Sequence, residues 1–579
     1  MNVRLLLRGG PAFVRTLMLV VTPLSMVMAQ VEEPGEKARN PQLTDKLEGP
    51  AELTEKIRKA ANLLNSDAEA SLKLLQEVMD AETATAEQRS HASHGQGEGY
   101  MKQKNWEKAA LAYEAATTFD PVPAELRALS LGSSAEARLK MGEKDKALSA
   151  YTAAVSVPDA PVQTVAKVLM GRAMLYKEVG NLDKAVEDLS TLATASGLDK
   201  DQRQSVLLRR ADILSKIGKK DAAIRDVTEA MEVKAMAPEQ RANALTFIAS
   251  MHLEKASLQK ARDNAKLALE TTPEPPASIK AKALYVLAET YSQEGNAEPA
   301  LRTYQEILEL PGPPLREQAV ARLQRVAILN RTNRAEAAVA ESMVLIDNKD
   351  TPPDLLAQAL VFRGIDHIKN KRFSEALLAL SQAIDLKETE PDQLGRALVD
   401  RATIHKQQGR PDEAKRDLQR LIELKGARPD NLAAGYGKLA LLAEESGKTE
   451  EAIELLTRAI LVPNVPAASF IMMMKLRSIY YMQLKKYDFA LADADHIRAL
   501  EEATPYDLAQ INAHKASIYG KMNRGWAALQ CFNDLLAVPG APTELRKVAL
   551  TNRAKIYESV GMKEKAEADR KQLENEGKE

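Results

Sequence analysis

Three polar side chains in the first fifth of the chain have the types and the spacing of a metal site. His91, His94 and Glu98 follow one another at i, i+3 and i+7, so a helix over this segment would place all three on one face. Two imidazoles and a carboxylate are ligands that zinc accepts. A solvated polar stripe on a helix explains the same spacing, and we favour that interpretation. We therefore expect no resident metal and no cofactor.

No other motif in the sequence has the residues of a catalytic centre. Gly447, Lys448 and Thr449 have the order in which a phosphate-binding loop ends, but that loop requires a glycine where the chain has Leu442. Cys531 is the only cysteine, which excludes an intramolecular disulfide, and we expect it to pack within a helix. The G-x-S-x-G and H-E-x-x-H motifs are absent. The sequence predicts a protein that is not an enzyme and has no direct small-molecule substrate.

Bulk composition narrows the classes of fold and partner. Apolar residues make up 45% and charged residues 28% of the 579 residues, which is enough to bury a core and too apolar for a disordered chain. The net charge is -1, from 80 Lys and Arg against 81 Asp and Glu. A bulk attraction to nucleic acid or to anionic lipid is therefore not indicated, and we expect no nucleic-acid partner. Aromatic residues are only 4%, so the core must consist mainly of Ala and Leu.

A repeat with a period of about 38 residues, in the range typical of stacked helix pairs, sets the positions of all these side chains. Its clearest unit, 172–189, has a small residue at Ala173, an aromatic at Tyr176, a turn glycine at Gly180, and then Ala185 and Asp188. The same frame places thirteen alanines at this constant interval, with one step longer by a single position: Ala109, Ala147, Ala185, Ala223, Ala261, Ala300, Ala338, Ala376, Ala414, Ala452, Ala490, Ala528 and Ala566. We predict a first helix of roughly 14 residues, a short turn and a second helix of about 13 residues in each unit.

Two further positions of the frame carry a family resemblance. Twelve residues before each repeat alanine the chain has Gly97, Ala135, Ala173, Ala211, Ala249, Ala288, Val326, Gly364, Ala402, Ala440, Ser478, Ala516 and Ala554, of which only Val326 is not small. Three residues later stand six tyrosines and three histidines: Tyr100, Tyr176, Tyr291, Tyr481, Tyr519, Tyr557, His252, His367 and His405. With these residues the chain resembles the tetratricopeptide repeat superfamily over roughly 51–579.

The resemblance implies an all-α fold, a right-handed α-solenoid of about 14 stacked antiparallel helix hairpins. A small residue at the first position would let the two helices of a hairpin approach closely. The usual unit of the family has about 34 residues, so the unit here is longer. We expect the additional residues to lengthen the loop or the second helix.

Comparison of the repeats with one another predicts a set of ion pairs. Seven repeats have arginine directly before the small residue, and in six of them an acid follows sixteen residues later: Arg172 and Asp188, Arg210 and Asp226, Arg325 and Glu341, Arg401 and Asp417, Arg477 and Asp493, Arg553 and Asp569. The seventh, Arg363, has Ala379 at that place, and a further repeat pairs Lys515 with Cys531. We expect each arginine and acid to form an ion pair that crosses from the first helix to the second.

The resemblance also implies that partner segments bind on the concave side of the first helices. At the matching positions the later repeats have apolar residues, which we take as the candidate partner groove: Val361, Ile365, Ile368, Val399, Leu441, Met472, Ile479 and Met482. Earlier repeats have acids there. Packing of the apolar residues between helices is the alternative. The family's clamp for a C-terminal carboxylate needs lysines and asparagines, and only Lys475 matches it, so that ligand is not expected.

The N-terminal residues 1–29 have the pattern of an export signal. Arg4, Arg8 and Arg15 precede an apolar run from 17 to 28, and Val27 and Ala29 provide the small residues that a signal peptidase reads. We predict cleavage after Ala29, and hence a periplasmic or secreted protein. An uncleaved segment that tethers the protein to a membrane is the alternative, although a run of about 14 residues is short for a span.

The remaining chain divides by composition. Residues 30–50 are polar and rich in proline, as expected of a flexible linker. Residues 51–85 have two short helical patterns that indicate an atypical capping hairpin, and 86–579 is the repeat array. We expect a non-enzymatic scaffold of the bacterial cell envelope that binds other proteins or peptide segments in its groove. An architectural envelope protein that assembles export or cell-wall machinery through its outer surface is the alternative.

Overall fold

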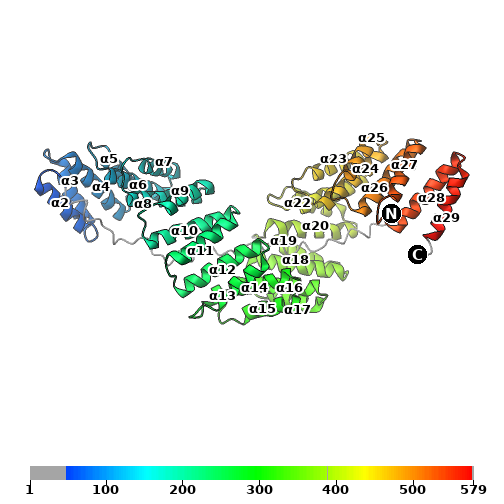
Figure 1. Ribbon diagram of the computed structural model, residues 1–579, viewed down its shortest axis with the longest axis horizontal. Helices are drawn as coiled ribbons and strands as arrows, with labels where there is room; N and C mark the ends of the chain where they lie inside the picture. The colour runs from blue at the N-terminus through cyan, green and yellow to red at the C-terminus, as the bar shows by residue number, and fades with distance from the viewer. Residues whose placement is uncertain (1–46, 388, 577–579) are drawn as a thin grey trace. The chain divides into compact units, whose positions relative to one another are not determined.

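A computed structural model describes residues 47–387 and 389–576. This part of the chain is folded into twenty-eight helices, α2–α29, with no strand (Figure 1). Consecutive helices pack as antiparallel pairs, so the prediction of an all-α solenoid built from about fourteen hairpins is confirmed. The predicted signal segment 1–29 and the predicted linker as far as residue 46 lie outside the described residues.

The helices divide between two compact units that meet at Ala321 and Arg322. The first unit has seven consecutive hairpins: α2 (Ala51–Leu63) and α3 (Ala68–Asp80), α4 (Ala86–Lys102) and α5 (Trp106–Ala116), α6 (Ala124–Lys140) and α7 (Lys144–Val155), α8 (Val162–Glu178) and α9 (Leu182–Thr194), α10 (Lys200–Lys216) and α11 (Lys220–Val233), α12 (Pro238–Glu254) and α13 (Leu258–Leu269), α14 (Ala277–Gln293) and α15 (Ala297–Glu309). The boundary falls inside α16 (Leu315–Arg331).

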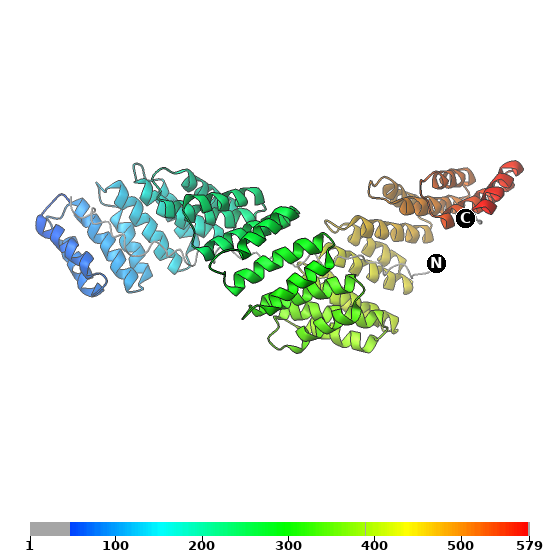
Figure 2. The same cartoon turned by 60° about the horizontal axis from the view of Figure 1, so that its bottom comes forward.

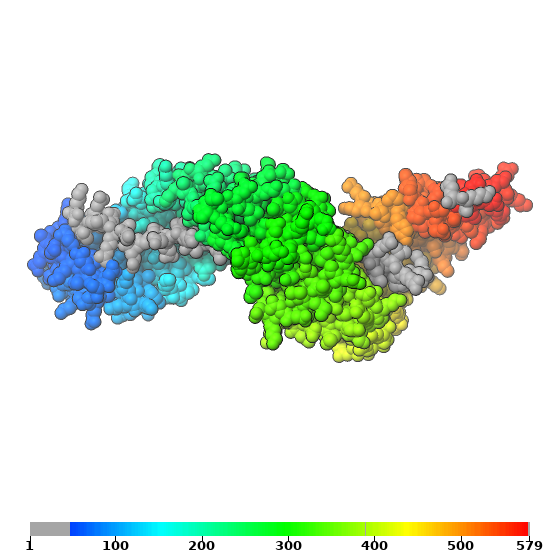
Figure 3. Space-filling model, turned by 90° about the horizontal axis from the view of Figure 1, so that it is seen from below, coloured from blue at the N-terminus to red at the C-terminus, as the bar shows by residue number. Residues whose placement is uncertain are grey.

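The second unit continues with the rest of α16 and then α17 (Ala335–Asp347), α18 (Pro353–Lys369) and α19 (Phe373–Asp385), α20 (Pro391–Gln407) and α21 (Pro411–Ile422), α22 (Pro429–Glu445) and α23 (Thr449–Ile460), α24 (Ala467–Gln483) and α25 (Tyr487–Arg498), α26 (Pro505–Lys521) and α27 (Gly525–Leu536), α28 (Thr543–Ser559) and α29 (Lys563–Asn575). In Figures 2 and 3 the colours follow one another in sequence order along each unit, because each hairpin packs on its neighbours in the chain.

The additional residues of the repeat lie mainly in the first helix. Every first helix from α4 to α28 spans 17 residues. The second helices are shorter, from 11 residues in α5 to 14 residues in α11. We had expected the loop or the second helix to be longer, and this prediction was wrong. Proline explains where several first helices begin: Pro238, Pro353, Pro391, Pro429 and Pro505 are the first residues of their helices, where the missing N–H removes no intrahelical hydrogen bond.

The turn between the two helices of each repeat has one fixed backbone conformation. In all thirteen repeats the residue five positions before the repeat alanine has a positive φ: Lys104, Gly142, Gly180, Gly218, Ala256, Gly295, Asn333, Lys371, Gly409, Gly447, Lys485, Asn523 and Gly561. Glycine and asparagine, which tolerate this left-handed conformation, occupy nine of these positions. The short turn forces the second helix back along the first, and so produces the hairpin.

Small residues at two positions allow the helices of a hairpin to approach closely. The repeat alanines are all buried, with at most 2% of each exposed. A Cβ atom added to Gly97 would lie 2.5 Å from the ring of Tyr113, and one added to Gly364 would lie 2.7 Å from Leu380. Larger side chains would therefore push the helices apart, as expected from the sequence.

First helices line the inner side of each unit. Consecutive first helices contact one another, as α6 and α8, α12 and α14, α18 and α20, and α20 and α22 do. In the described part of the chain, packing between consecutive second helices is weaker than this. Because the first helices are closer together, each unit curves toward them, and their free faces form its inner surface. None of the described helices has both the length and the hydropathy that a membrane span requires.

All six predicted ion pairs join the two helices of their hairpins. The shortest distances between the guanidinium and the carboxylate lie between 2.5 and 2.7 Å. Five of the pairs are bidentate, with Nε and Nη2 of the arginine donating to the two oxygens of the aspartate. Both partners are largely covered by the hairpin, which fixes the register of one helix against the other.

Four of these arginines also bind the preceding hairpin, which the sequence analysis did not predict. Nη1 donates to a side-chain oxygen twenty residues earlier, as from Arg477 to Thr457 at 2.9 Å and from Arg553 to Asn533 at 2.8 Å. The same bond joins Arg401 to Ser381 and Arg172 to Thr152. The arginine therefore links three helices: its own, its partner and the second helix before them.

Candidate functional site

The structure places the eight candidate groove residues in two different environments. Val361 is fully buried and Val399 is only 8% exposed, and both belong to the core between α18, α19 and α20. The expectation that these two line an open groove was wrong, because their positions on the helix face the neighbouring helices rather than the inner surface. The alternative of packing between helices holds for them.

The other six residues reach the surface and form what we call the apolar inner surface of the second unit. Ile365 and Ile368 on α18, Leu441 on α22, and Ile479 and Met482 on α24 are half-buried, and Met472 on α24 is 38% exposed. Ile365, Ile368 and Ile479 also pack against core residues, so their positions are fixed. Helix α20 interrupts the surface with polar residues, since Thr403 occupies the corresponding position and Arg396 pairs with Asp400 at 2.9 Å.

Eleven residues before the repeat alanine, where the second unit has Ile365, Leu441 and Ile479, the first unit has an acid in four repeats and Met174 and Ser250 in the other two. Asp212 on α10 is 1% exposed, and its Oδ2 accepts from Lys177 of α8 at 2.7 Å and from Lys216 at 3.2 Å. Glu289 on α14 is 7% exposed, and its Oε2 accepts from the hydroxyl of Tyr304 at 2.9 Å. These carboxylates are bound by groups of the same unit and so help to hold the helices together.

Lys475 is engaged by its own unit. Its ammonium group lies 2.6 Å from Asp507 and 2.9 Å from the amide oxygen of Gln510, both on α26, the next first helix. The ammonium also lies over the ring of Tyr506. A free carboxylate would have to displace Asp507, which agrees with the expectation that this lysine is not part of a carboxylate clamp.

The histidines of α4 take part in local contacts. His94 is 9% exposed, and its Nδ1 lies 2.8 Å from the hydroxyl of Ser130 on the next first helix. Nδ1 of His91 lies 2.9 Å from the carbonyl of Glu87, one turn earlier. Burial lowers the pKa of His94 to about 4, with a smaller contribution from His91. Within 47–387 and 389–576 there is no cluster of three His, Cys, Asp or Glu residues arranged to hold a metal ion.

Three histidines occupy the aromatic position of the repeat. His252, His367 and His405 each have a buried Nδ1 without a hydrogen-bond partner, and burial is the main cause that lowers the pKa of each. In three of the six repeats that have tyrosine instead, the repeat arginine lies over its ring: Arg172 over Tyr176, Arg477 over Tyr481 and Arg553 over Tyr557. Nine of the thirteen repeats have a tyrosine or histidine ring at this position, which agrees with a packing role. Cys531 is likewise 4% exposed, and burial raises the pKa of its thiol.

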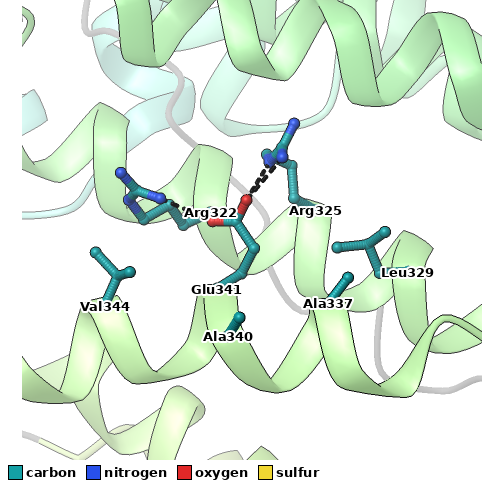
Figure 4. A pocket seen from close by; sticks show the side chains of 7 residues that line it. All are labelled: Arg322, Arg325, Leu329, Ala337, Ala340, Glu341 and Val344. Atoms are coloured by element: carbon teal, nitrogen blue, oxygen red, sulfur yellow. Dashed lines mark hydrogen bonds and ion pairs between the residues drawn. The ribbon is translucent and has the colours of Figure 1, made fainter.

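A hollow of about 320 Å³ lies between α16 and α17 in the second unit (Figure 4). Glu341 points between Arg322 and Arg325, at 2.8 and 2.7 Å, while Ala337, Ala340, Leu329 and Val344 supply an apolar lining. The sequence analysis identified the pair with Arg325 and missed Arg322. Comparison of the repeats could have identified Arg322. Four residues before the small position, eight other repeats have leucine, and this repeat has arginine.

Comparisons with known proteins agree with the repeat frame. Sequence profiles of the tetratricopeptide repeat match residues 399–469 and 281–312. The matched segments contain hairpins of both units and have the small residues and repeat alanines described above. The chain contains tetratricopeptide repeats. No curated protein matches it in sequence.

Two solved structures that match the chain share little sequence with it. The crystal structure of the APC/C hetero-tetramer Cut9-Hcn1 matches with 14% identity and a TM-score of 0.33, over 86% of this chain and 96% of that one. The crystal structure of yeast Tom70 matches with 13% identity and a TM-score of 0.38, over 78% of this chain and 99% of that one.

Proposed function

We propose that this tetratricopeptide-repeat protein is a non-enzymatic scaffold of the bacterial cell envelope, which binds segments of partner proteins on the apolar inner surface of the second unit. Repeats of this family are typical of interaction scaffolds. The single observation that carries the more specific proposal is the contrast at the position eleven residues before the repeat alanine: α10 and α14 have buried acids there that accept hydrogen bonds from the same unit, while α18, α22 and α24 have the half-buried Ile365, Leu441 and Ile479.

The chemistry of this surface suits an extended or helical segment with apolar side chains. Ile365, Ile368 and Ile479 are held by core neighbours, so a partner would meet an ordered surface and lose little of its binding free energy to ordering. Met472 and Met482 can adapt to partners of different shape. Burial of apolar area would supply the favourable part of the binding free energy.

The envelope location in this proposal rests on the N-terminal sequence alone. Three arginines, an apolar run from 17 to 28 and the small residues before Gln30 favour export with cleavage after Ala29. Sequencing the N-terminus of the native protein tests this point, since a chain that begins at Gln30 is expected. A chain that still begins at Met1 would contradict cleavage and favour a tether.

Charge placed on the apolar inner surface tests the binding site. The double substitution Ile365→Glu and Ile479→Glu is expected to abolish recovery of partners from native membranes, because a buried carboxylate without a counter-charge opposes binding. A matched control is Met174→Glu with Ser250→Glu, which adds the same charge at the same repeat position in the first unit. The control should retain recovery, and circular dichroism should show equal helicity in all variants.

Recovery that survives the double substitution would contradict the inner-surface proposal. Salt-resistant recovery of that kind would instead favour the architectural alternative, in which the outer second helices assemble the envelope machinery. Exposed apolar side chains on those helices, such as Leu111 at 58% and Leu378 at 63%, are where that alternative would first be tested.

A further inference from the structure

Two large aromatic side chains are exposed on adjacent hairpins of the second unit. Trp526 is 64% exposed and Phe489 is 60% exposed. They lie in the first turns of α27 and α25, next to the tight turns that end α26 and α24. Both are therefore at the same edge of the unit, formed by the tips of consecutive hairpins.

The repeat itself shows that folding does not require these aromatics. At the position of Trp526 the other twelve repeats have polar or acidic residues: Glu107, Asp145, Asp183, Asp221, Gln259, Glu298, Glu336, Ser374, Asp412, Glu450, Asp488 and Glu564. At the position of Phe489 the other repeats have lysine, glutamate, alanine or proline. The two departures fall on neighbouring hairpins, in a chain with only 4% aromatic residues. An exposed aromatic pair that packing does not explain indicates a binding surface.

Four cations surround the aromatic pair. Lys485 and Lys486 precede Phe489, and Lys521 and Arg524 precede Trp526; all four are exposed, and none has an ion-pair partner among the residues that the structure describes. Asp488 is the only acid within 483–490 and 520–527. The chain as a whole has a net charge of -1, so the positive charge is a local property of this edge.

Local packing holds the side chain of Phe489 in position before any partner binds. The ring of Phe489 stacks on that of Tyr481 with the centroids 5.3 Å apart and the planes 28° apart. Arg477 lies over the other ring of this stack, Tyr481, and is itself bound to Asp493. Phe489 is therefore held in an outward position by Tyr481, which in turn contacts Arg477 of the Arg477–Asp493 ion pair.

We propose that this aromatic and basic edge, defined by Lys485, Lys486, Phe489, Lys521, Arg524 and Trp526, docks the second unit on an anionic phospholipid surface. Tryptophan and phenylalanine enter the boundary between headgroups and acyl chains, where an indole N–H can still be solvated. Lysine and arginine beside them are attracted to the phosphates of anionic lipids. Hairpin tips present both kinds of group along one edge, as contact with a flat surface requires. The edge is separate from the apolar inner surface, so the two proposals can fail independently.

Trp526 provides a direct test, because the chain has only two tryptophans. In the full chain with Trp106→Phe, fluorescence reports Trp526 alone. Vesicles of phosphatidylcholine and phosphatidylglycerol at about 7:3 are expected to shift its emission to the blue, and vesicles of phosphatidylcholine alone to shift it little. Raising the salt from about 50 to about 500 mM should weaken the effect, since it screens the cations.

Co-sedimentation with the same vesicles tests the residues. Trp526→Glu and Phe489→Glu use residues that other repeats have at these positions, so the fold should tolerate them, and each is expected to reduce binding about tenfold. Leu378→Glu is the matched control, since it removes an apolar side chain of equal exposure elsewhere in the same unit, and should leave binding unchanged. All variants have the same N-terminal segment, so differences among them report the edge.

Three results would overturn the proposal. One is an emission of Trp526 that does not respond to anionic vesicles. Another is equal sedimentation of the Trp526→Glu, Phe489→Glu and Leu378→Glu variants. The third is binding of a polyglutamate peptide that requires the four cations while the vesicles fail to bind, which would assign the edge to an acidic protein segment instead of a membrane.

Discussion

The two units use the same hairpin but have different inner surfaces. In the first unit the inner positions of α10 and α14 have buried acids, Asp212 and Glu289, and each accepts hydrogen bonds from side chains of the same unit. In the second unit the equivalent positions of α18, α22 and α24 have Ile365, Leu441 and Ile479, which remain half-exposed. At this position the first unit has acids that bind neighbouring side chains, and the second unit has apolar side chains in contact with water.

This contrast separates a structural role from a binding role. An internal network of charges stabilises the hairpins that contain it, whereas partly exposed isoleucine and leucine add little to the stability of the free protein. If the interpretation is right, substitutions on the inner surface of the first unit should lower stability, and those on the second unit should mainly lower binding.

The largest effect is expected at Asp212. In Asp212→Ala two lysines lose the carboxylate that bridges α8 and α10, and we expect the free energy of unfolding of the first unit to fall by about 3 kcal/mol. Leu441→Ala, on the second unit, should cost about 1 kcal/mol because the side chain is only half-buried. Hydrogen exchange followed peptide by peptide measures both units in one protein. Equal losses of protection in the two variants would contradict the distinction between the surfaces.

The ion pairs across the hairpin should behave alike in the two units. Arg401→Ala removes a bidentate pair with Asp417 and a bond to Ser381, and should destabilise its hairpin by about 2 kcal/mol. Arg172→Ala in the first unit should have a similar effect, because its bonds are equivalent. A double-mutant cycle of Arg401 with Asp417 isolates the pair, and a coupling near zero would show that the pair contributes little.

These ion pairs show how much of the fold could be predicted from the sequence. Thirteen copies of one unit served as an internal alignment, so that arginine and acid could be matched before any coordinates were known. The repeat alanines and the turns were predicted for the same reason. The length of the first helix was misjudged, because a helix can extend by one turn at its N-terminal end without changing the spacing of the repeat.

The candidate site could be predicted less well than the fold. Residues on one helix face were grouped together by spacing, but a helix in a stacked array has three kinds of neighbour: its partner, the adjacent hairpins and the solvent. Val361 and Val399 face adjacent helices, while Ile365 faces the inner surface. A difference of one helical turn decides between core and surface, and the sequence does not determine the angle between neighbouring hairpins. The pair of Arg322 with Glu341 does not follow from the common repeat pattern, because eight other repeats have leucine at the position of Arg322.

Mild acid should destabilise the first unit through His94. The pKa of His94, in the first unit, is lowered to about 4 by burial, below its ordinary value of 6.5. The unfolded chain therefore binds this proton more tightly, so stability is complete above pH 6.5 and is lost as the pH falls toward 4. At pH 5.5 we expect a loss of about 1.5 kcal/mol from this group. Replacement by Gln should remove most of this dependence in the first unit, and a pH profile of exchange protection that is the same with and without His94 would contradict the assignment.

The smallest predicted effect concerns the turns, where the two units should again agree. Ala256 in the first unit and Lys371 in the second have φ of 54° and 58° at a position where most repeats have glycine. A Cβ atom is strained in this conformation, so Ala256→Gly and Lys371→Gly should each stabilise the protein, by about 0.5 kcal/mol, despite the greater freedom of glycine in the unfolded chain. The reverse change, Gly180→Ala, at φ 81°, should destabilise it by about 1 kcal/mol. Chemical denaturation measures all three. If both glycine substitutions lowered stability while Gly180→Ala did not, the turn conformation would have to differ among repeats, and the common frame used to compare the units would fail at that position.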